Sequence, residues 1–290
     1  MRPSCRLVLL ALLLAAGCSA SAEPPPSAEP ASSATAPPPA EPAPPASALV
    51  DLEPPTHPVD GLTLRRVRFA DRTFRVATLD LQRVHLDLAG QSADFTRPAT
   101  FSQLQDKLEG EGRRLIWGTN AGIFREGGRP SGLYVEGGRQ VVPLETRSGS
   151  GNFYLKPNGA FLVDSQGARI RTTEELSGSP LADVRLATQS GPLLARDGVL
   201  HDKINPDSKN LLLRSGVGVT DPNTVHFAMS EGSVRFHELA TLFRDGLHTP
   251  DALYLDGVIS QWVDPGQPPG ATDGGFGGLF FLASPAEPAR

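Results

Sequence analysis

The sequence predicts an α+β fold: a single domain with a mixed, strand-rich sheet core and a few helices. Short runs of alternating apolar and polar residues recur from residue 61 onward, and Gly, Pro and Asn turns separate them. Only two segments have helical spacing, and no internal repeat is present. The roughly 230 residues of this region are enough for one sizeable core.

Each element is predicted from its own pattern. Residues 101–109 and 236–245 carry apolar side chains at helical spacing, and each segment stops close to a glycine. Gly-Gly and Asn-Gly turns predict two hairpins, 132–144 and 152–163. The other predicted strands are 62–69, 73–79, 84–88, 115–118, 185–188, 211–219, 225–229, 251–255 and 279–282.

The N-terminus has the pattern of a targeting segment. Residues 1–17 combine a basic start with an apolar run that is too short to span a bilayer, as in a secretory signal peptide. The segment ends in Leu-Ala-Ala-Gly before Cys18, which resembles the bacterial lipobox. The resemblance implies lipidation of Cys18 and a cell-envelope protein, at the outer membrane facing the periplasm if the source is Gram-negative. The alternative is an ordinary signal peptide with an incidental cysteine.

A Pro-, Ala- and Ser-rich segment follows. Residues 21–55 hold 12 of the 28 prolines, and such a composition has too little apolar surface to offset its ordering entropy. We therefore expect a disordered tether over 18–55 and a folded domain over 56–290.

Charge and cysteine content exclude several functions. The net charge is −5, and residues 61–290 carry 25 basic against 26 acidic residues once Arg2, Arg6 and the six acids of 19–60 are removed. Without a basic excess, no nucleic-acid partner is expected. Both cysteines, Cys5 and Cys18, precede the domain, so a cysteine nucleophile or a cysteine-bound metal is not expected in it.

Standard catalytic motifs are absent from the chain. It has no dinucleotide-binding or phosphate-loop glycine motif and no Gly-x-Ser-x-Gly elbow. His237-Glu238 begins like a zinc-protease motif, but the second histidine position is Thr241. We expect neither a metal nor an organic cofactor.

Five polar turns each follow an apolar strand, where sheets of the α/β type tend to place ligand sites. They are Asn120-Ala121-Gly122-Ile123-Phe124, Pro130-Ser131-Gly132-Leu133, Gln189-Ser190-Gly191-Pro192-Leu193, Arg214-Ser215-Gly216-Val217-Gly218-Val219 and Leu255-Asp256-Gly257-Val258-Ile259-Ser260. In this order and spacing the turns resemble the phosphodiester glycosidase family, over about residues 61–283. The uncovering enzymes of that family usually have Leu-Asp-Gly-Gly, whereas Val258 follows Gly257 here. This departure leaves the sugar substrate open.

The resemblance implies a hydrolase that acts at the anomeric carbon of sugar-1-phosphodiesters. Such a reaction passes through an oxocarbenium-like transition state and needs a carboxylate, while the phosphate needs a cation. We expect Asp256 to be the base, nucleophile or electrostatic stabiliser, and Arg214 to bind the phosphate. Contacts to the glycan or sugar-phosphodiester are expected from the side chains of Asn120, Gln189, Ser190, His201 and Ser260 and the backbone N–H groups of Gly122, Gly191 and Gly257.

Each role has a structural alternative. Asp256 can belong to a plain turn, Arg214 to a buried ion pair, Asn120 to a turn cap and His201 to a surface loop. Four further residues stay open, as sugar platforms or second carboxylates: Trp117, Trp262, Glu126 and Asp273. Two other functions also stay open, a non-catalytic glycan-binding envelope lipoprotein that uses the same cleft, and an anchored scaffold.

Overall fold

The computed structural model describes residues 48–90, 98–257, 259–266 and 274–286, all within one compact unit, Pro45–Arg290. The predicted signal peptide 1–17, the predicted lipidation site Cys18, residues 18–47 of the predicted tether and the possible second carboxylate Asp273 lie outside the described residues. In the described part of the chain, no helix has the length and apolar character needed to cross a bilayer.

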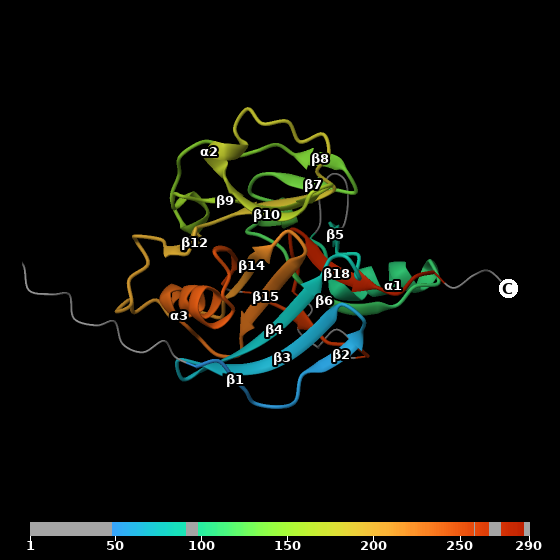
Figure 1. Cartoon of the computed structure of the whole chain (residues 1–290). Helices are drawn as coiled ribbons and strands as arrows, with labels where there is room; N and C mark the ends of the chain where they lie inside the picture. Colours follow the sequence, from blue (N-terminus) through green and yellow to red (C-terminus); the bar gives the residue numbers. More distant parts are fainter. Residues whose placement is uncertain (1–47, 91–97, 258, 267–273, 287–290) are drawn as a thin grey trace, which may run out of the picture. The chain divides into compact units, whose positions relative to one another are not determined.

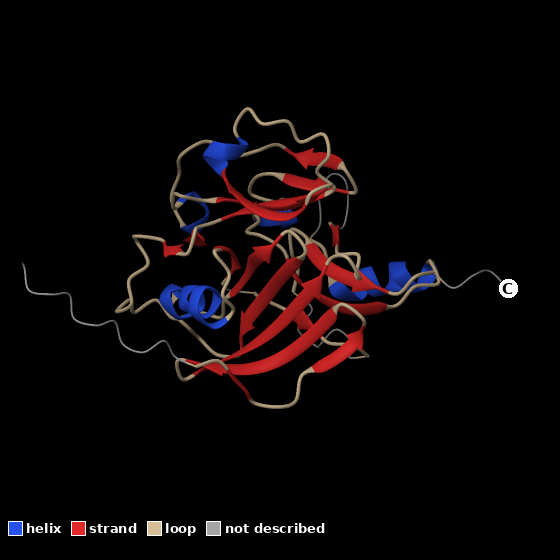
Figure 2. Cartoon of the chain, in the orientation of Figure 1, coloured by secondary structure: helices blue, strands red, loops and turns tan. Residues whose placement is uncertain are grey.

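The described residues form three sheets and few helices (Figures 1 and 2), which confirms the strand-rich single domain. The first sheet has nine strands: β1 (Val50–Asp51), β2 (Thr56–Val59), β3 (Leu62–Phe69), β4 (Arg72–Asp80), β12 (Leu193–Arg196), β13 (Val199–Leu200), β14 (Ser215–Asp221), β15 (Thr224–Ser230) and β16 (Asp251–Asp256). Its order is β1-β3-β4-β15-β14-β16-β12-β13, with β2 paired to β3.

The other two sheets are smaller. The five-stranded sheet has the order β10-β9-β11-β7-β8 and consists of β7 (Tyr134–Glu136), β8 (Arg139–Val142), β9 (Gly159–Asp164), β10 (Gly167–Thr172) and β11 (Leu186–Ser190). The four-stranded sheet has the order β17-β6-β18-β5 and consists of β5 (Asp87–Ala89), β6 (Leu115–Asn120), β17 (Trp262–Val263) and β18 (Leu279–Ala283). The helical segments are α1 (Phe101–Gly110), α2 (Thr173–Leu176), α3 (Phe236–Thr241) and the short turns η1 (Glu126–Gly128), η2 (Asn152–Tyr154) and η3 (Leu242–Gly246).

The strand directions differ from the prediction. The prediction of a mixed sheet is wrong, because every pairing between the described strands is antiparallel. The physical reason lies in the connections: short turns join pairs such as β3 and β4, β9 and β10, and β14 and β15. A parallel neighbour would need a crossover of about a dozen residues or more.

Strand pairing begins earlier than the expected domain start at residue 56. Val50 pairs with Arg68, and Leu52 N donates to Arg66 O at 2.8 Å. Residues 46–53 contain no proline, so β1 keeps its backbone donors and joins the edge of β3.

The predicted hairpin 152–163 is also wrong. Residues 152–154 form η2, and the partners of β9 are β10 and β11. Asn158 explains the difference because its buried side chain is used elsewhere: Nδ2 donates to Phe153 O at 2.7 Å, and Oδ1 accepts from Thr173 Oγ1 at 2.8 Å. The Asn-Gly pair therefore ties the chain to α2 and does not close a two-residue hairpin.

The three sheets meet in one central core. Leu253 and Leu255 of β16 pack there with Trp117 of β6 and Phe161 of β9. Tyr254, between the two leucines, faces the second core under α3. Because β16 is covered on both faces, its carboxyl end is rigidly supported.

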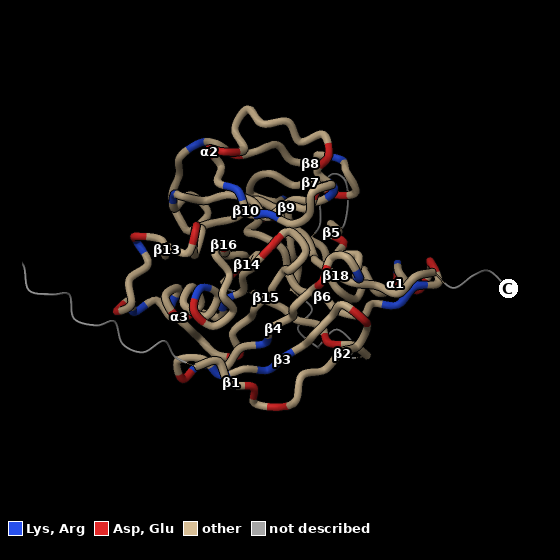
Figure 3. Tube along the Cα trace, viewed as in Figure 1, with Lys and Arg blue, Asp and Glu red and all other residues tan. Residues whose placement is uncertain are grey.

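Charges of both signs are interspersed along the trace (Figure 3). Some of them join distant segments: Arg75 of β4 pairs with Glu231 at 3.3 Å and with Asp264, just after β17, at 2.6 Å. Within the described ranges, no group of three or more His, Cys, Asp or Glu side chains is placed to hold a metal ion.

A half-buried imidazole on β15 makes the stability depend on pH. His226 Nδ1 lies 2.9 Å from Thr78 Oγ1, and Nε2 lies 3.1 Å from Thr220 Oγ1. Burial, followed by the charge of Arg65, lowers the pKa of His226 from 6.5 to about 4. Between these values the unfolded chain binds the proton and the folded chain does not, so the free energy of unfolding should fall as the pH drops from 6.5 towards 4. The contribution of His226 to the slope of the free energy of unfolding against pH should approach about 1.4 kcal/mol per pH unit.

Urea unfolding at pH 7, 6 and 5 measures this slope. The His226→Gln variant should lose part of this slope and keep the part due to His201, whose pKa is also lowered by burial. His57→Gln, at an exposed position, should keep the whole slope. Equal slopes in the wild type and His226→Gln would show that another group causes the dependence.

Candidate active site

Strands from all three sheets end around Asp256. Asp256 is the last residue of β16 in the nine-stranded sheet, Asn120 ends β6 in the four-stranded sheet, and Ser190 ends β11 in the five-stranded sheet. Ser215, the first residue of β14, lies opposite Asp256 in the strand register. The fold therefore gathers four of the polar turns that are far apart in the sequence.

Hydrogen bonds join these strand ends. Ser215 Oγ donates to the main-chain oxygen of Asp256 at 3.3 Å, and Ser260 Oγ lies 3.1 Å from Ser215 Oγ and 3.3 Å from the same oxygen. Asn120 Nδ2 donates to Ser215 Oγ at 3.1 Å, and Asn120 Oδ1 accepts from Gln261 N at 3.2 Å. Together they form one network around the turn that follows β16.

Two members of this network were absent from the predicted site. Ser215 stood next to Arg214 in one of the polar turns, so its position was a usable signal. Gln261 takes part through its backbone N–H, which no residue pattern marks.

The Asp256 carboxylate lies at the edge of the network. The residue is half-buried, and its Oδ1 accepts from Gly257 N at 2.5 Å. Its main-chain oxygen is held by the two serine hydroxyls. The turn thus orients the carboxylate while leaving the residue partly open to solvent, as a group that acts on a substrate requires.

Ser190 and Asn120 are buried residues that contact the strands leading into and next to this turn. Ser190 Oγ donates to Leu255 O at 3.1 Å and accepts from Ile123 N at 3.3 Å, and the residue is fully buried. Asn120 is also buried. Both side chains hold strand ends in place, and their predicted sugar contacts are not supported by this geometry.

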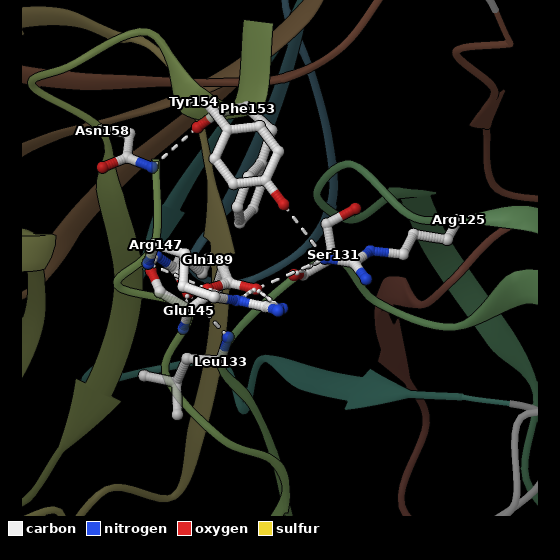
Figure 4. A network of polar contacts seen from close by, with 9 residues as sticks. All are labelled: Arg125, Ser131, Leu133, Glu145, Arg147, Phe153, Tyr154, Asn158 and Gln189. Atoms are coloured by element: carbon white, nitrogen blue, oxygen red, sulfur yellow. Dashed lines mark hydrogen bonds and ion pairs between the residues drawn. The ribbon is translucent and has the colours of Figure 1, made fainter. Parts of the chain in front are cut away.

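The side chain of Gln189 is fully engaged within the protein (Figure 4). Its Oε1 accepts from the backbone nitrogens of Leu133 and Glu145, both at 2.9 Å. Its Nε2 donates to Glu145 O at 2.8 Å and to Thr173 Oγ1 at 2.9 Å. This uses every hydrogen-bonding position of the amide, so Gln189 fastens neighbouring loops to β11 instead of facing a sugar.

Gly132 provides the space for that amide, which leads to a prediction. A Cβ at residue 132 would overlap Gln189 Oε1 and lie 2.8 Å from the Phe153 ring. Gly132→Ala should therefore displace the amide and lower the free energy of unfolding by about 2–3 kcal/mol. Gly110→Ala is the matched control, since nothing lies within 4 Å of a Cβ there. Urea unfolding compares the two variants, and equal stability would contradict the close fit.

Close packing also accounts for the three glycines that were predicted to offer backbone N–H groups. An added Cβ would lie 2.9 Å from Gln189 O at Gly122 and 2.7 Å from Phe153 O at Gly191. At Gly257 it would overlap the Tyr254 hydroxyl. Each glycine is needed where two segments touch, and its role towards an oxyanion stays a prediction.

Arg214 lies inside the protein. Its guanidinium stacks 3.7 Å from the centroid of the Phe236 ring, and Nε donates to Val234 O at 2.9 Å. Its NH1 group reaches the Tyr254 hydroxyl at 3.5 Å, and burial lowers the pKa of the guanidinium. With an exposed fraction of 0%, it has no open path to a phosphate. In the described part of the chain no carboxylate pairs with Arg214, and its NH2 group donates to Asn210 Oδ1 at 3.1 Å.

His201 is buried and does not belong to a surface loop. Its Nδ1 accepts from Lys203 N at 3.1 Å, which assigns the ring proton to Nε2. Burial lowers the pKa of His201 below 6.5. No contact among the described residues joins this ring to Asp256.

The tryptophans differ in their exposure. Trp117 is buried in the central core and meets the Trp262 ring edge-on at 5.3 Å. Trp262 is half-buried, and its Nε1 donates to Asp264 Oδ1 at 2.8 Å beside a cleft of about 400 Å³. Glu126, the other possible second carboxylate, is exposed in η1.

Comparison with known proteins identifies relatives of this chain. A family model described as phosphodiester glycosidase matches residues 113–263, which include the turns around Asn120, Ser190 and Asp256. The uncharacterized protein YigE of Escherichia coli (strain K12) is 31% identical over 189 residues, which are 65% of this chain and 73% of that protein.

A solved structure shares the fold. It is the catalytic domain of zebrafish N-acetylglucosamine-1-phosphodiester alpha-N-acetylglucosaminidase, auto-inhibited by its pro-peptide. The match has a TM-score of 0.54 at 12% identity and covers 83% of this chain and 85% of that one. At this identity the likeness concerns the fold.

Proposed function

The chain belongs to the phosphodiester glycosidase family, and we propose that it hydrolyses the glycosidic bond of sugar-1-phosphodiesters. One observation supports this most directly: strand ends from three sheets converge on the turn that carries the half-buried residue Asp256. A carboxylate on a rigid turn is what a reaction at an anomeric carbon uses to stabilise positive charge.

In the proposed reaction the bond between the anomeric carbon and the phosphate oxygen breaks. Its electron pair leaves with the phosphate, and Asp256 stabilises the developing oxocarbenium charge or removes a proton from the attacking water. Water adds its oxygen to the anomeric carbon. One of its protons stays in the new sugar hydroxyl, and the other ends on the released phosphomonoester. The products are the free sugar and that phosphomonoester.

Ser215, Ser260 and Asn120 have a positioning role in this proposal. They hold the backbone of the turn, so that the carboxylate does not have to reorganise during the reaction. Arg214 also supports this turn: it donates to the Tyr254 hydroxyl, which lies against Gly257.

The proposal includes a location. The lipobox-like segment at Cys18 suggests a lipid anchor in a bacterial envelope, at the outer membrane facing the periplasm in a Gram-negative source, and the Pro-rich segment after it a tether that reaches up to roughly 100 Å. Phosphodiester-linked sugars of cell-wall polymers or exopolysaccharides are the proposed substrates in that setting.

Sugar release by the purified protein from N-acetylglucosamine-1-phosphodiesters and from cell-wall glycan fragments tests the proposal. We expect free sugar and phosphomonoester in equal amounts. Binding of a glycan without release from any substrate would favour the glycan-binding lipoprotein instead.

A further inference from the structure

Three arginines border a cleft beside the candidate active site. The cleft has a volume of about 380 Å³, and its walls come from Arg125 and from residues 129–131 and 142–147. Arg125, Arg129 and Arg147 supply its positive charge and Glu145 its negative charge. We call it the arginine cleft.

The carboxylate of Glu145 offsets only part of this charge. Arg147 Nε donates to Glu145 Oε1 at 2.9 Å, and Arg125 NH2 lies 3.4 Å from Glu145 Oε2. Arg129 is exposed and makes no ion pair with any residue that the structure describes. Three guanidinium groups against one carboxylate leave an excess of two positive charges.

The cleft is built on a fixed framework (Figure 4). Gln189 bonds both the backbone nitrogen and the backbone oxygen of Glu145, at 2.9 and 2.8 Å. Arg125 NH2 also donates to the Tyr154 hydroxyl at 3.1 Å and lies 3.4 Å from Ser131 O. Hydrogen bonds with Arg147 hold the pKa of Glu145 at about 2, so the carboxylate stays ionised at neutral pH.

Two residues separate the cleft from the turn that carries Asp256. Ser190 Oγ bonds both Leu255 O and Ile123 N, at 3.1 and 3.3 Å. Ile123 O in turn accepts from Ser131 N at 3.0 Å, and Ser131 lines the cleft. This path sets the cleft on the order of 10 Å from the end of β16.

We propose that the arginine cleft binds the phosphate group of the substrate, with Arg129 and Arg147 as its ligands. The proposal rests on the proposed function for the identity of the substrate. The planar guanidinium of Arg129 can donate two parallel hydrogen bonds to phosphate oxygens. The Nε and NH2 groups of Arg147 are bound to Glu145, so Arg147 would donate from its NH1 group. Two net positive charges match a phosphodiester or a phosphomonoester. In this proposal, exposed arginines bind the phosphate, which is the role predicted from the sequence for Arg214. Arg214 itself is buried.

Calorimetry with inorganic phosphate tests the cleft without requiring turnover. Phosphate should bind the wild-type protein and the Asp256→Asn variant equally. Arg129→Ala and Arg147→Ala should each weaken binding about tenfold. Arg129→Lys should restore part of the loss, because it returns the charge without the fork of donors.

The matched control is Arg68→Ala, which removes an exposed arginine of β3. Equal phosphate affinity in Arg68→Ala, Arg129→Ala and Arg147→Ala would overturn the proposal. Arg125 is left intact because it also contacts Ser131 and Tyr154. Thermal unfolding should stay unchanged in Arg129→Ala, because Arg129 makes no ion pair with any residue that the structure describes. Arg147→Ala should unfold at a lower temperature, because it removes the main partner of the Glu145 carboxylate, whose side chain is only 9% exposed.

Steady-state kinetics separates the two proposals. If the wild type releases sugar, Arg129→Ala should raise KM about tenfold with little change in kcat, and phosphate should inhibit competitively. An unchanged KM in both arginine variants would overturn the proposed phosphate site and leave the proposed hydrolase function unaffected. If no sugar is released but phosphate binding still depends on the two arginines, the phosphate site is supported and the proposed function is wrong.

Discussion

Replacing Asp256 with Asn should lower the rate of sugar release by about 10²- to 10⁴-fold. The amide has nearly the same shape, and its Oδ1 can still accept from Gly257 N, as the carboxylate oxygen does at 2.5 Å. It lacks the negative charge that stabilises an oxocarbenium ion and the basicity that activates water. The main-chain bonds from Ser215 and Ser260 do not involve the side chain, so the turn should persist. Initial rates with a sugar-1-phosphodiester measure the effect.

Asp183→Asn is the matched control for this change. Asp183 is exposed and has no ion pair among the described residues, so its variant should keep the wild-type rate. Thermal unfolding of both variants should stay close to that of the wild type. A wild-type rate in Asp256→Asn would remove Asp256 from the chemistry, whatever the outcome at the arginine cleft.

Replacing Arg214 with Ala should lower the free energy of unfolding by about 3 kcal/mol or more. The change leaves a cavity beside Phe236, whose ring centroid lies 3.7 Å from the guanidinium, and removes the donor to Val234 O. It also frees the Tyr254 hydroxyl, which lies next to the turn after β16. Urea unfolding measures the loss, and activity should fall through misplacement of that turn.

Two comparisons make the Arg214 result specific. Arg214→Lys keeps the charge but loses the stacked plane and the fork of donors, so most of the destabilisation should remain. Arg68→Ala should change the free energy of unfolding by less than about 0.5 kcal/mol. A variant Arg214→Ala that is as stable as the wild type but has a tenfold higher KM would mean that this guanidinium reaches the phosphate after all.

The longer strands could be predicted because their patterns are local. Residues 62–69 alternate along a half-covered face and form β3, and the helical spacing of 101–109 forms α1. Short elements such as β13 and β17 have two residues each and no periodicity to detect. The predicted strand 211–219 begins only at Ser215, where pairing with Asp256 and Met229 starts.

The membership of the site could be predicted better than the roles in it. The turns at Asn120, Ser190 and Asp256 do meet, as the family resemblance implied. Residue type did not distinguish a side chain that faces a substrate from one that faces the protein. Gln189 is polar and lies near the end of an apolar strand, yet all four hydrogen-bonding positions of its amide are occupied by Leu133, Glu145 and Thr173.

The sequence by itself determined the family, the strand-rich class and the turns that make up the candidate site. The tertiary structure alone decided that Arg214 is buried, that the strands are antiparallel and that the exposed arginines lie at another cleft. The physical reason is the range of the interactions. Periodicity reports contacts within a few residues, whereas burial depends on contacts such as that between Asn120 and Gln261, which are 141 residues apart.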